Sequence, residues 1–204
     1  MKKIGLLGSA VVGQTLAQGF KQHGYEVRIG SRSPAKLASF TESSGIPAGT
    51  FDAVGEWGEL LVLAVHGTVA VEALTLAGAA NHRGKVVIDA TNPPKATPAG
   101  MSGLETLMSW APEAHWVKAF NTLPTSVLTR RRGHDPLLAE FVCTDLVDAR
   151  LTASKLIRDL GFAPVFAGRA DTARYVETGG PLQMNEIDVQ DATDVLAGVL
   201  GDYI

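Results

Sequence analysis

Cysteine, long apolar runs and metal-binding patterns are what this sequence lacks. Cys143 is the one cysteine in 204 residues, and there is no CxxC pair and no cluster of histidine and cysteine, so no metal site is expected. Cys143 follows Phe141 and Val142 in an apolar run, which predicts a buried thiol in a reducing compartment. The longest apolar run, residues 60–65, is far too short to cross a bilayer. We therefore expect a soluble, cytoplasmic protein.

Charge is also scarce. Charged residues make up 19% of the chain, below the usual quarter, and apolar residues make up 46%, so much of the chain should be buried in the fold or in an oligomer. The net charge of −3 provides no basic excess to attract nucleic acid or an acidic membrane. A chain of 204 residues is long enough for one domain with a full core. We expect residues 1–204 to form a single domain that acts on a small molecule.

Short apolar runs alternate with helical patterns along most of the chain. The continuous run at residues 60–65 is typical of a parallel strand that is covered on both faces. Further strands are expected at residues 3–7, 25–30, 45–50, 85–90, 115–119, 139–143 and 164–167, and helices at residues 12–23, 35–40, 51–58, 67–80, 103–110 and 145–160. Strands that alternate with helices predict an α/β fold, a doubly wound and mainly parallel sheet of the Rossmann type.

The first strand leads into a turn of small residues that suits a dinucleotide. Gly8 permits a backbone angle that is closed to most residues, and Gly13 allows the following helix to pack closely on the strand. The free N–H groups at the start of that helix favour a pyrophosphate. Ala10 stands where the usual G-x-G-x-x-G pattern has its second glycine, and alanine adds only a methyl group. The residues expected to bind the cofactor here are Gly8, Ser9, Ala10, Val11, Val12 and Gly13.

A signal peptide is the alternative interpretation of the same stretch, because Lys2 and Lys3 precede an apolar segment. Three glycines interrupt that segment, and its removal would delete a strand that the next helix and strand need. The dinucleotide turn is therefore the favoured interpretation.

The end of the second strand indicates which dinucleotide binds. Units that bind NAD usually carry an acidic residue there, which holds the ribose hydroxyls. This chain instead has Ser31, Arg32 and Ser33, followed by Lys36. A guanidinium, an ammonium and two hydroxyls favour a phosphate dianion, so NADP(H) is the expected cofactor. The alternative is a solvated basic face with no ligand.

The carboxyl ends of three further strands should meet at the ligand cleft, as in other open sheets. These ends are Ala64, Val65 and His66, then Asn92 and Pro93, then Asn121, Thr122 and Leu123. We expect the first five residues to bind the cofactor or line its acceptor side. The last three are expected to bind the substrate.

Four segments carry a resemblance to a known family: residues 29–34 (IGSRSP), 87–93 (VIDATNP), 117–122 (VKAFNT) and, more weakly, 159–168. They resemble the NADPH-dependent reductases of the deazaflavin coenzyme F420, whose N-terminal domain is shared with STEAP-type metalloreductases. The resemblance implies an NADP(H)-binding Rossmann fold and a homodimer. It also implies that residues 169–204 form a small C-terminal extension near the cofactor cleft or the dimer interface.

The expected function is hydride transfer between NADPH and a flavin-like acceptor such as coenzyme F420. His66 could instead act as a general acid in an imine or carbonyl reductase, but hydride transfer to a deazaflavin requires mainly alignment. A non-catalytic NADP(H) sensor is the alternative from another class, because a Rossmann fold does not separate these functions. Asp89 is expected to brace a loop. Residues 130–132, three arginines, are expected to form a solvated loop and not a phosphate site.

Overall fold

The computed structural model describes residues 2–94, 97 and 100–201. The last three residues of the predicted C-terminal extension therefore lie outside the described residues. The chain forms one eight-stranded sheet with the order β3-β2-β1-β4-β5-β6-β7-β8. The first six of these strands are parallel, β7 is antiparallel to β6, and β8 is parallel to β7. The predicted doubly wound, mainly parallel sheet is confirmed.

The strands are β1 (Lys3–Leu7), β2 (Glu26–Gly30), β3 (Ala48–Gly49), β4 (Leu60–Leu63), β5 (Val86–Asp89), β6 (His115–Lys118), β7 (Ala139–Cys143) and β8 (Ala163–Gly168). The α-helices are α1 (Val11–Gln22), α2 (Ala38–Ser44), α3 (Phe51–Trp57), α4 (Ala70–Ala77), α5 (Ala79–His82), α6 (Gly103–Trp110), α7 (Thr125–Arg130), α8 (Val147–Asp159) and α9 (Val189–Gly201). Three short 3-10 helices are η1 (Pro34–Leu37), η2 (Gly67–Val69) and η3 (Ala170–Tyr175).

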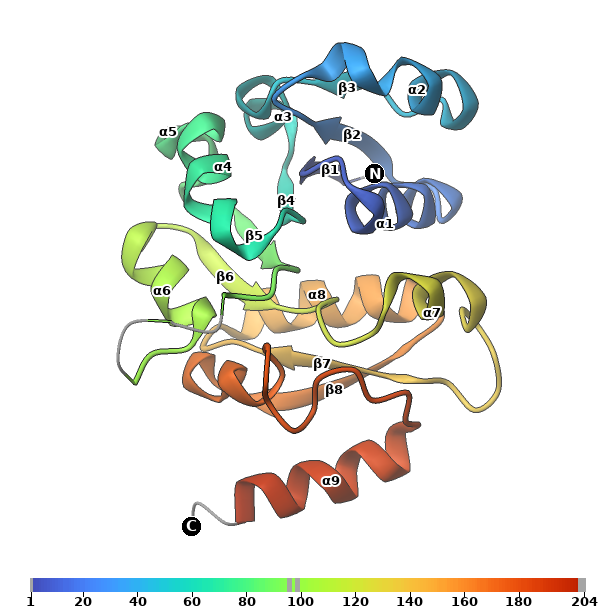
Figure 1. Ribbon diagram of the computed structural model, residues 1–204, viewed down its shortest axis with the longest axis vertical. Helices are drawn as coiled ribbons and strands as arrows, with labels where there is room; N and C mark the ends of the chain where they lie inside the picture. Colours follow the sequence, from blue (N-terminus) through green and yellow to red (C-terminus); the bar gives the residue numbers. More distant parts are fainter. Residues whose placement is uncertain (1, 95–96, 98–99, 202–204) are drawn as a thin grey trace.

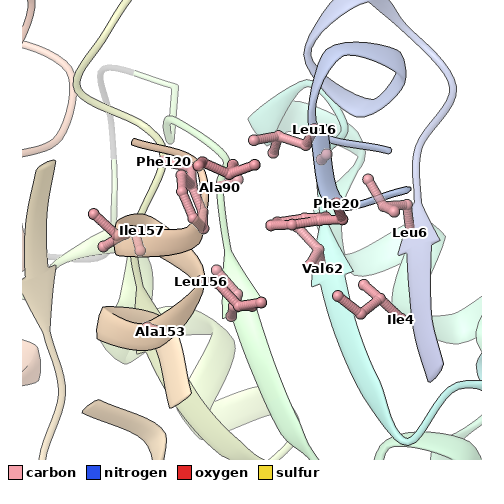
Figure 2. Close-up of a cluster of buried hydrophobic side chains, with 14 of the residues drawn as sticks. Ile4, Leu6, Leu16, Phe20, Val62, Ala90, Phe120, Ala153, Leu156 and Ile157 are labelled. Carbon is pink, nitrogen blue, oxygen red and sulfur yellow. The ribbon is translucent and has the colours of Figure 1, made fainter. Parts of the chain in front are cut away.

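Helices cover both faces of the sheet, as Figure 1 shows. Helices α1, α7 and α8 pack on one face and α3, α4 and α6 on the other, while α9 covers β8 on the same face as α6. The central strand β4 is buried along its whole length, as its continuous apolar run predicts. In the hydrophobic core between the sheet and helices α1, α7 and α8, Phe20 of α1 meets Phe120 edge to face, with ring centroids 5.9 Å apart (Figure 2). This pair joins the two halves of the sheet beneath the carboxyl end of β6.

Several predicted elements need correction. The helix expected at residues 67–80 is divided into η2, α4 and α5, because Gly78 has a positive φ of 86° and interrupts the helix. The third strand contracts to two residues, Ala48–Gly49. Helix α7 was not expected, since its six residues are too few to show a period. The segment expected to form a C-terminal extension contains η3 and α9.

The solvated position expected of the three arginines at residues 130–132 is found for Arg130, which is 61% exposed and pairs with Glu186, and not for the other two. Arg131 and Arg132 are half-buried, and the Arg132 Nη1 donates to Gln22 Oε1 of α1 at 2.9 Å. Burial lowers the pKa of Arg132. Arg132 therefore fastens the end of α7 to α1, away from the cofactor turn. Within the described residues, no helix is both long enough and apolar enough to cross a membrane.

The reversal at β7 returns the end of the chain to the carboxyl edge of the parallel strands. The Ala139 N–H donates to the Ile187 carbonyl, and the Met184 N–H donates to the Thr122 carbonyl, each at 2.9 Å. Residues 176–188 therefore lie beside the loops that follow β5 and β6. This irregular segment, which lies outside the strand–helix alternation, thus reaches the edge of the sheet at which the strands end.

Candidate functional site

A cleft of about 350 Å³ lies at the carboxyl ends of β1, β2 and β4. Its lining includes most of the residues predicted to bind the cofactor: Gly8, Ser9, Ala10, Ser31, Arg32, Ser33, Lys36, Ala64, Val65 and His66. The turn after β1 and the basic segment after β2 are therefore brought together around one hollow, as an adenosine with a 2′-phosphate requires.

Two glycines of the turn are required by the protein itself. Gly8 has a φ of +136°, and a Cβ at that position would lie 2.2 Å from the Ala64 carbonyl oxygen. A Cβ on Gly13 would lie 2.2 Å from the Gly8 carbonyl oxygen, where α1 crosses the turn. Ala10 is exposed and lines the cleft, so its methyl group displaces no part of the protein. Of the three glycine positions of the pattern, the one occupied by alanine is therefore the one whose side chain faces the cleft and not the protein.

The start of α1 lies beside this cleft and has backbone donors that are not paired with any of the residues the structure describes. Ala10 is the N-cap residue and has no polar side chain, and no acidic residue lies in the first turn. The first intrahelical bond runs from the Gln14 N–H to the Ala10 carbonyl at 3.0 Å, so the three N–H groups before it are left for a ligand. The Gln14 side chain also donates to the Ser9 carbonyl at 2.8 Å and braces the turn. A pyrophosphate fits these donors and the positive end of the helix dipole.

The basic end of the cleft contains an acidic residue that the local sequence does not reveal. Arg32 Nη1 lies 3.2 Å from Glu72 Oε1, and the two side chains are 65% and 50% exposed. Glu72 belongs to α4, forty residues further along the chain, and it lines the same cleft. The Ser31 Oγ accepts from the Ser33 N–H at 3.1 Å and shapes the loop around Arg32. This end of the cleft therefore holds its guanidinium in an exposed ion pair.

A second hollow of about 480 Å³ adjoins the first. Both are lined by Ala10, Ala64, Val65 and His66, and the second also by Val12, Gly67, Ala90, Asn92, Pro93, Pro94 and Thr178. The two hollows form one groove across the strand ends, which is the place where open α/β sheets bind a dinucleotide. Val12, Asn92 and Pro93 thus lie where the sequence predicts them. Val11 is 68% exposed at the start of α1 and is not among the residues that line either hollow.

His66 lies between the two hollows and caps η2. Its Nδ1 accepts from the Thr68 backbone N–H at 3.4 Å and lies 2.8 Å from the Thr68 hydroxyl. In the tautomer in which Nδ1 accepts both of these bonds, the proton of the neutral ring is on Nε2. The imidazole can therefore donate a hydrogen bond to a ligand without being charged. The next residue, Gly67, touches the Asn92 carbonyl so closely that a Cβ would lie 1.9 Å from it, so the β4 and β5 loops are fixed to each other.

The three residues predicted to bind substrate lie deeper than expected. Asn121, Thr122 and Leu123 are all buried. Asn121 exchanges hydrogen bonds with Asn92, from Asn92 Nδ2 to the Asn121 carbonyl at 3.0 Å and from Asn121 Nδ2 to Asn92 Oδ1 at 3.2 Å. The Thr122 hydroxyl donates to Glu140 Oε2 at 3.0 Å. These side chains support the floor of the groove, and a substrate would have to displace their bonds to reach them.

Glu140 of β7 is fully buried beneath the loop that follows β6. Burial raises the pKa of Glu140 to about 8, against the opposing effect of bonds from Thr122 and from the backbone N–H groups of Phe120 and Leu123. Phe120 has a φ of 62°, a conformation that a bulky residue adopts only under constraint. The carboxyl group of Glu140 thus holds a strained loop at the edge of the groove.

Asp89 braces a loop, as expected, and also takes part in a cluster that was not expected. Its Oδ1 accepts from the Thr91 N–H at 2.9 Å. Its Oδ2 lies 2.7 Å from Lys118 Nζ, which in turn lies 3.1 Å from Glu177 Oε1.

The predicted core position of Cys143 is confirmed, since it is fully buried and burial raises the pKa of its thiol to about 12.

Comparison with known proteins agrees with this geometry. Residues 3–93 match the family described as NADP oxidoreductase, coenzyme F420-dependent. The chain is 31% identical over 179 residues to the metalloreductase STEAP3 of Rattus norvegicus, a match that covers 86% of this chain and 36% of that protein. The chain thus spans about a third of the length of the curated relatives it matches.

Two solved structures match nearly the whole chain. One, provisionally described as an F420-dependent NADP reductase from Arthrobacter sp., is 30% identical, with a TM-score of 0.80 and coverage of 98% of this chain and 96% of that one. A hypothetical protein from Sinorhizobium meliloti is 27% identical, with a TM-score of 0.82 and coverage of 92% and 96%. The groove, the family match and these full-length similarities together show that the chain belongs to the NADP oxidoreductase family described as coenzyme F420-dependent.

Proposed function

We propose that the protein transfers a hydride between NADP(H) and a flat, flavin-like acceptor, of which coenzyme F420 is the first candidate. The observation that carries this proposal is the single groove across the strand ends, with Arg32, Ser31 and Lys36 at one end and Asn92 and Pro93 at the other. A dinucleotide laid along it places its 2′-phosphate at the first end. Its nicotinamide then lies at the second end, where an acceptor can reach it.

Each part of the groove has a physical task in this proposal. The N–H groups at the start of α1 hold the pyrophosphate. Arg32 and Lys36 neutralise the 2′-phosphate, and Ser31 and Ser33 donate hydrogen bonds to it. Bound NADPH supplies the hydride from C4 of its nicotinamide. The protein aligns the two rings and excludes water.

The preference for NADP(H) over NAD(H) follows from the charges at the end of β2. A 2′-phosphate can replace the Glu72 carboxylate as the partner of Arg32, because their exposed ion pair is weak, worth about 0–1 kcal/mol. A ribose without that phosphate would leave the Arg32–Glu72 pair in place. The acidic residue that usually holds a 2′-hydroxyl at the end of this strand is a serine or arginine here.

A reductase of imines or carbonyl groups is the second candidate function, and the position of His66 favours it. Reduction of such a group requires a proton as well as a hydride, and His66, whose imidazole is able to donate one, lines both hollows. Hydride transfer to a flat deazaflavin depends mainly on alignment of the two rings, so it depends less on a proton from His66 than reduction of an imine or a carbonyl does. The side chain would then contact the cofactor or a ribose hydroxyl.

The decisive experiment mixes the purified protein with NADPH and oxidised coenzyme F420 and follows the absorbance of the deazaflavin. Rapid bleaching with NADPH and not with NADH supports both the cofactor and the acceptor. NADPH binding without bleaching removes F420 as the acceptor, and the same assay then proceeds with flavins, quinones, ferric complexes and imines. Absence of turnover with every acceptor favours the sensor.

We also propose that the protein is a cytoplasmic homodimer. The support is the resemblance to reductases that are usually dimeric, together with exposed large apolar side chains such as Leu151 and Val147 on α8. Sedimentation velocity at micromolar concentration tests this directly. A single species with the mass of one chain would contradict it.

A further inference from the structure

Three ionisable side chains are buried together where β5 and β6 end. Asp89 and Lys118 are fully buried and Glu177 is 3% exposed, and Lys118 Nζ contacts both carboxylates, at 2.7 and 3.1 Å. Burial alone lowers the pKa of Lys118, but the attraction of the two carboxylates outweighs it and the pKa is raised. The ammonium group therefore stays charged in the interior. We call these three residues the buried ion cluster.

Glu177 is the member of the cluster that belongs to the C-terminal part of the chain, and it is fixed on every side. Its carboxylate accepts from the backbone N–H groups of Gly103 and Leu104, at 2.8 and 3.0 Å, in the first turn of α6. A Cβ on Gly103 would lie 3.0 Å from Glu177 Oε1 and 2.8 Å from Pro93. The glycine therefore lets α6, the β5 loop and Glu177 meet at one point.

The residues on either side of Glu177 reach the groove. The Val176 carbonyl accepts from Asn121 Nδ2 at 2.7 Å, and the same amide bonds to Asn92. Thr178 is exposed and lines the second hollow together with Asn92 and Pro93. Residues 176–178 are thus tied to the strand ends by the Val176 carbonyl and by the buried ion cluster, and Thr178 is the residue among them that lines the second hollow.

The cluster is a poor way to gain stability alone. A buried ion pair loses the hydration of both charges, and apolar side chains of similar volume often serve stability as well or better. Buried charged groups instead fix the geometry of the segments that carry them, because each of their hydrogen bonds must be kept to offset the lost hydration. The cluster therefore specifies where the chain passes over the groove.

We propose that Thr178 contacts the hydride acceptor, and that Lys118 and Glu177 are positioning residues which hold it there. This inference rests on the proposed function, since it assigns the acceptor side of the same groove. The ligand it implies is a flat heteroaromatic ring with a carbonyl or ring N–H at its edge. The threonine hydroxyl bonds to that edge and its methyl group packs against the ring.

The test measures binding and does not depend on turnover. The protein is saturated with NADP⁺, and oxidised F420 and, separately, FMN are titrated into the binary complex by calorimetry. Thr178→Val removes the hydroxyl and keeps the shape, and it should weaken probe binding about three- to tenfold, the effect of one lost hydrogen bond. Thr178→Ser keeps the hydroxyl and loses only the methyl contact, so it should weaken probe binding less than Thr178→Val does, and NADP⁺ affinity should be unchanged in both. Thr193→Val on α9 is the matched control.

The positioning role has its own measurement. Glu177→Gln keeps the size of the side chain and removes its charge. It should lower the unfolding temperature, because it breaks a buried ion pair, and it should weaken probe binding while NADP⁺ affinity changes much less. If Glu177→Gln does not fold, the pair Thr178→Val and Thr178→Ser decides the inference.

The outcomes separate the inference from the function on which it rests. Equal losses of probe and NADP⁺ in Thr178→Val, or no loss of either, would overturn the inference. A wild type that binds NADP⁺ but neither probe would also overturn it, while the cofactor half of the proposed function stands. A wild type that binds no NADP⁺ would overturn the proposed function itself.

Discussion

Arg32 of the β2 loop and Glu72 of α4 face each other across the mouth of the groove, with Nη1 3.2 Å from Oε1. The pair joins two segments that are forty residues apart. It sets the guanidinium at the place where the 2′-phosphate of a dinucleotide would lie. Both partners are at least half exposed, so a dianion can compete with the carboxylate at little cost.

Arg32→Ala should weaken NADPH binding about tenfold or more, because a charge-assisted contact to the phosphate contributes roughly 1.5–3 kcal/mol. NADH affinity should change little. Fluorescence titration of the reduced nicotinamide measures both constants on the same sample. Equal losses for the two cofactors would refute the phosphate assignment.

Glu72→Gln should act in the opposite direction. Removal of the carboxylate frees Arg32 and removes a repulsion of the phosphate, so NADPH affinity should rise about two- to fivefold, in keeping with an exposed pair of about 0.5–1 kcal/mol. The gain should shrink at high salt, because exposed charges are screened. Glu113→Gln, in the exposed pair with Arg83 on another part of the surface, is the control. A loss of NADPH affinity in Glu72→Gln would show that the carboxylate positions Arg32 for the ligand.

Ala10→Gly should preserve or improve cofactor binding, since it removes the methyl group that lines the groove. Gly13→Ala should instead destabilise the protein, because the new Cβ would lie 2.2 Å from the Gly8 carbonyl oxygen. Thermal unfolding and NADPH titration of the two variants separate the requirement of the fold from that of the ligand. A collapse of affinity in Ala10→Gly would mean that the turn binds the dinucleotide in another way.

His66→Ala distinguishes alignment from proton donation. If the acceptor is a deazaflavin, turnover should stay near that of the wild type and NADPH binding should be retained. If the acceptor is an imine or a carbonyl, turnover should fall about 10²- to 10⁴-fold, the usual contribution of a general acid. Thr68→Ala, which removes the hydroxyl beside Nδ1, shows whether the cap at η2 alone accounts for any loss.

Glu140→Gln should change how stability depends on pH. The Glu140 carboxyl keeps its proton up to a pKa of about 8 in the folded protein, while the ordinary value is 4.5. Between these values unfolding releases a proton, so the free energy of unfolding falls as pH rises from about 4.5 to 8. Glutamine does not titrate and should flatten this decline. Urea unfolding at several pH values measures it, with the exposed Glu42→Gln as control; an unchanged slope would contradict the assignment.

The parts of the site that could be predicted are those whose signal is local. Gly8, Ala10 and Gly13 lie within one turn, and Arg32 directly follows a strand, so a strand–helix–strand pattern was enough to place them. The position of Asn92 followed from the rule that ligands lie at strand ends. These inferences needed no contact between distant segments.

The parts that escaped prediction are brought in from far along the chain. Glu72 meets Arg32 through the packing of α4, and Glu177 meets Lys118 only because β7 reverses the sheet. The burial of Thr122 depends on Glu140 of β7. No periodicity in the sequence reports such contacts. Arg132 likewise looked solvated because its partner, Gln22, lies on another helix.

The return of the chain after β8 divides the groove between two stretches of sequence. Residues between 8 and 76 line both hollows, whereas Ala90, residues 92–94 and Thr178 line the second hollow and not the first. In the proposed arrangement, a substitution at Thr178 would change the surface that meets the acceptor and leave the lining of the first hollow unchanged. The choice of cofactor and the choice of acceptor would therefore depend, in that arrangement, on different segments of the chain.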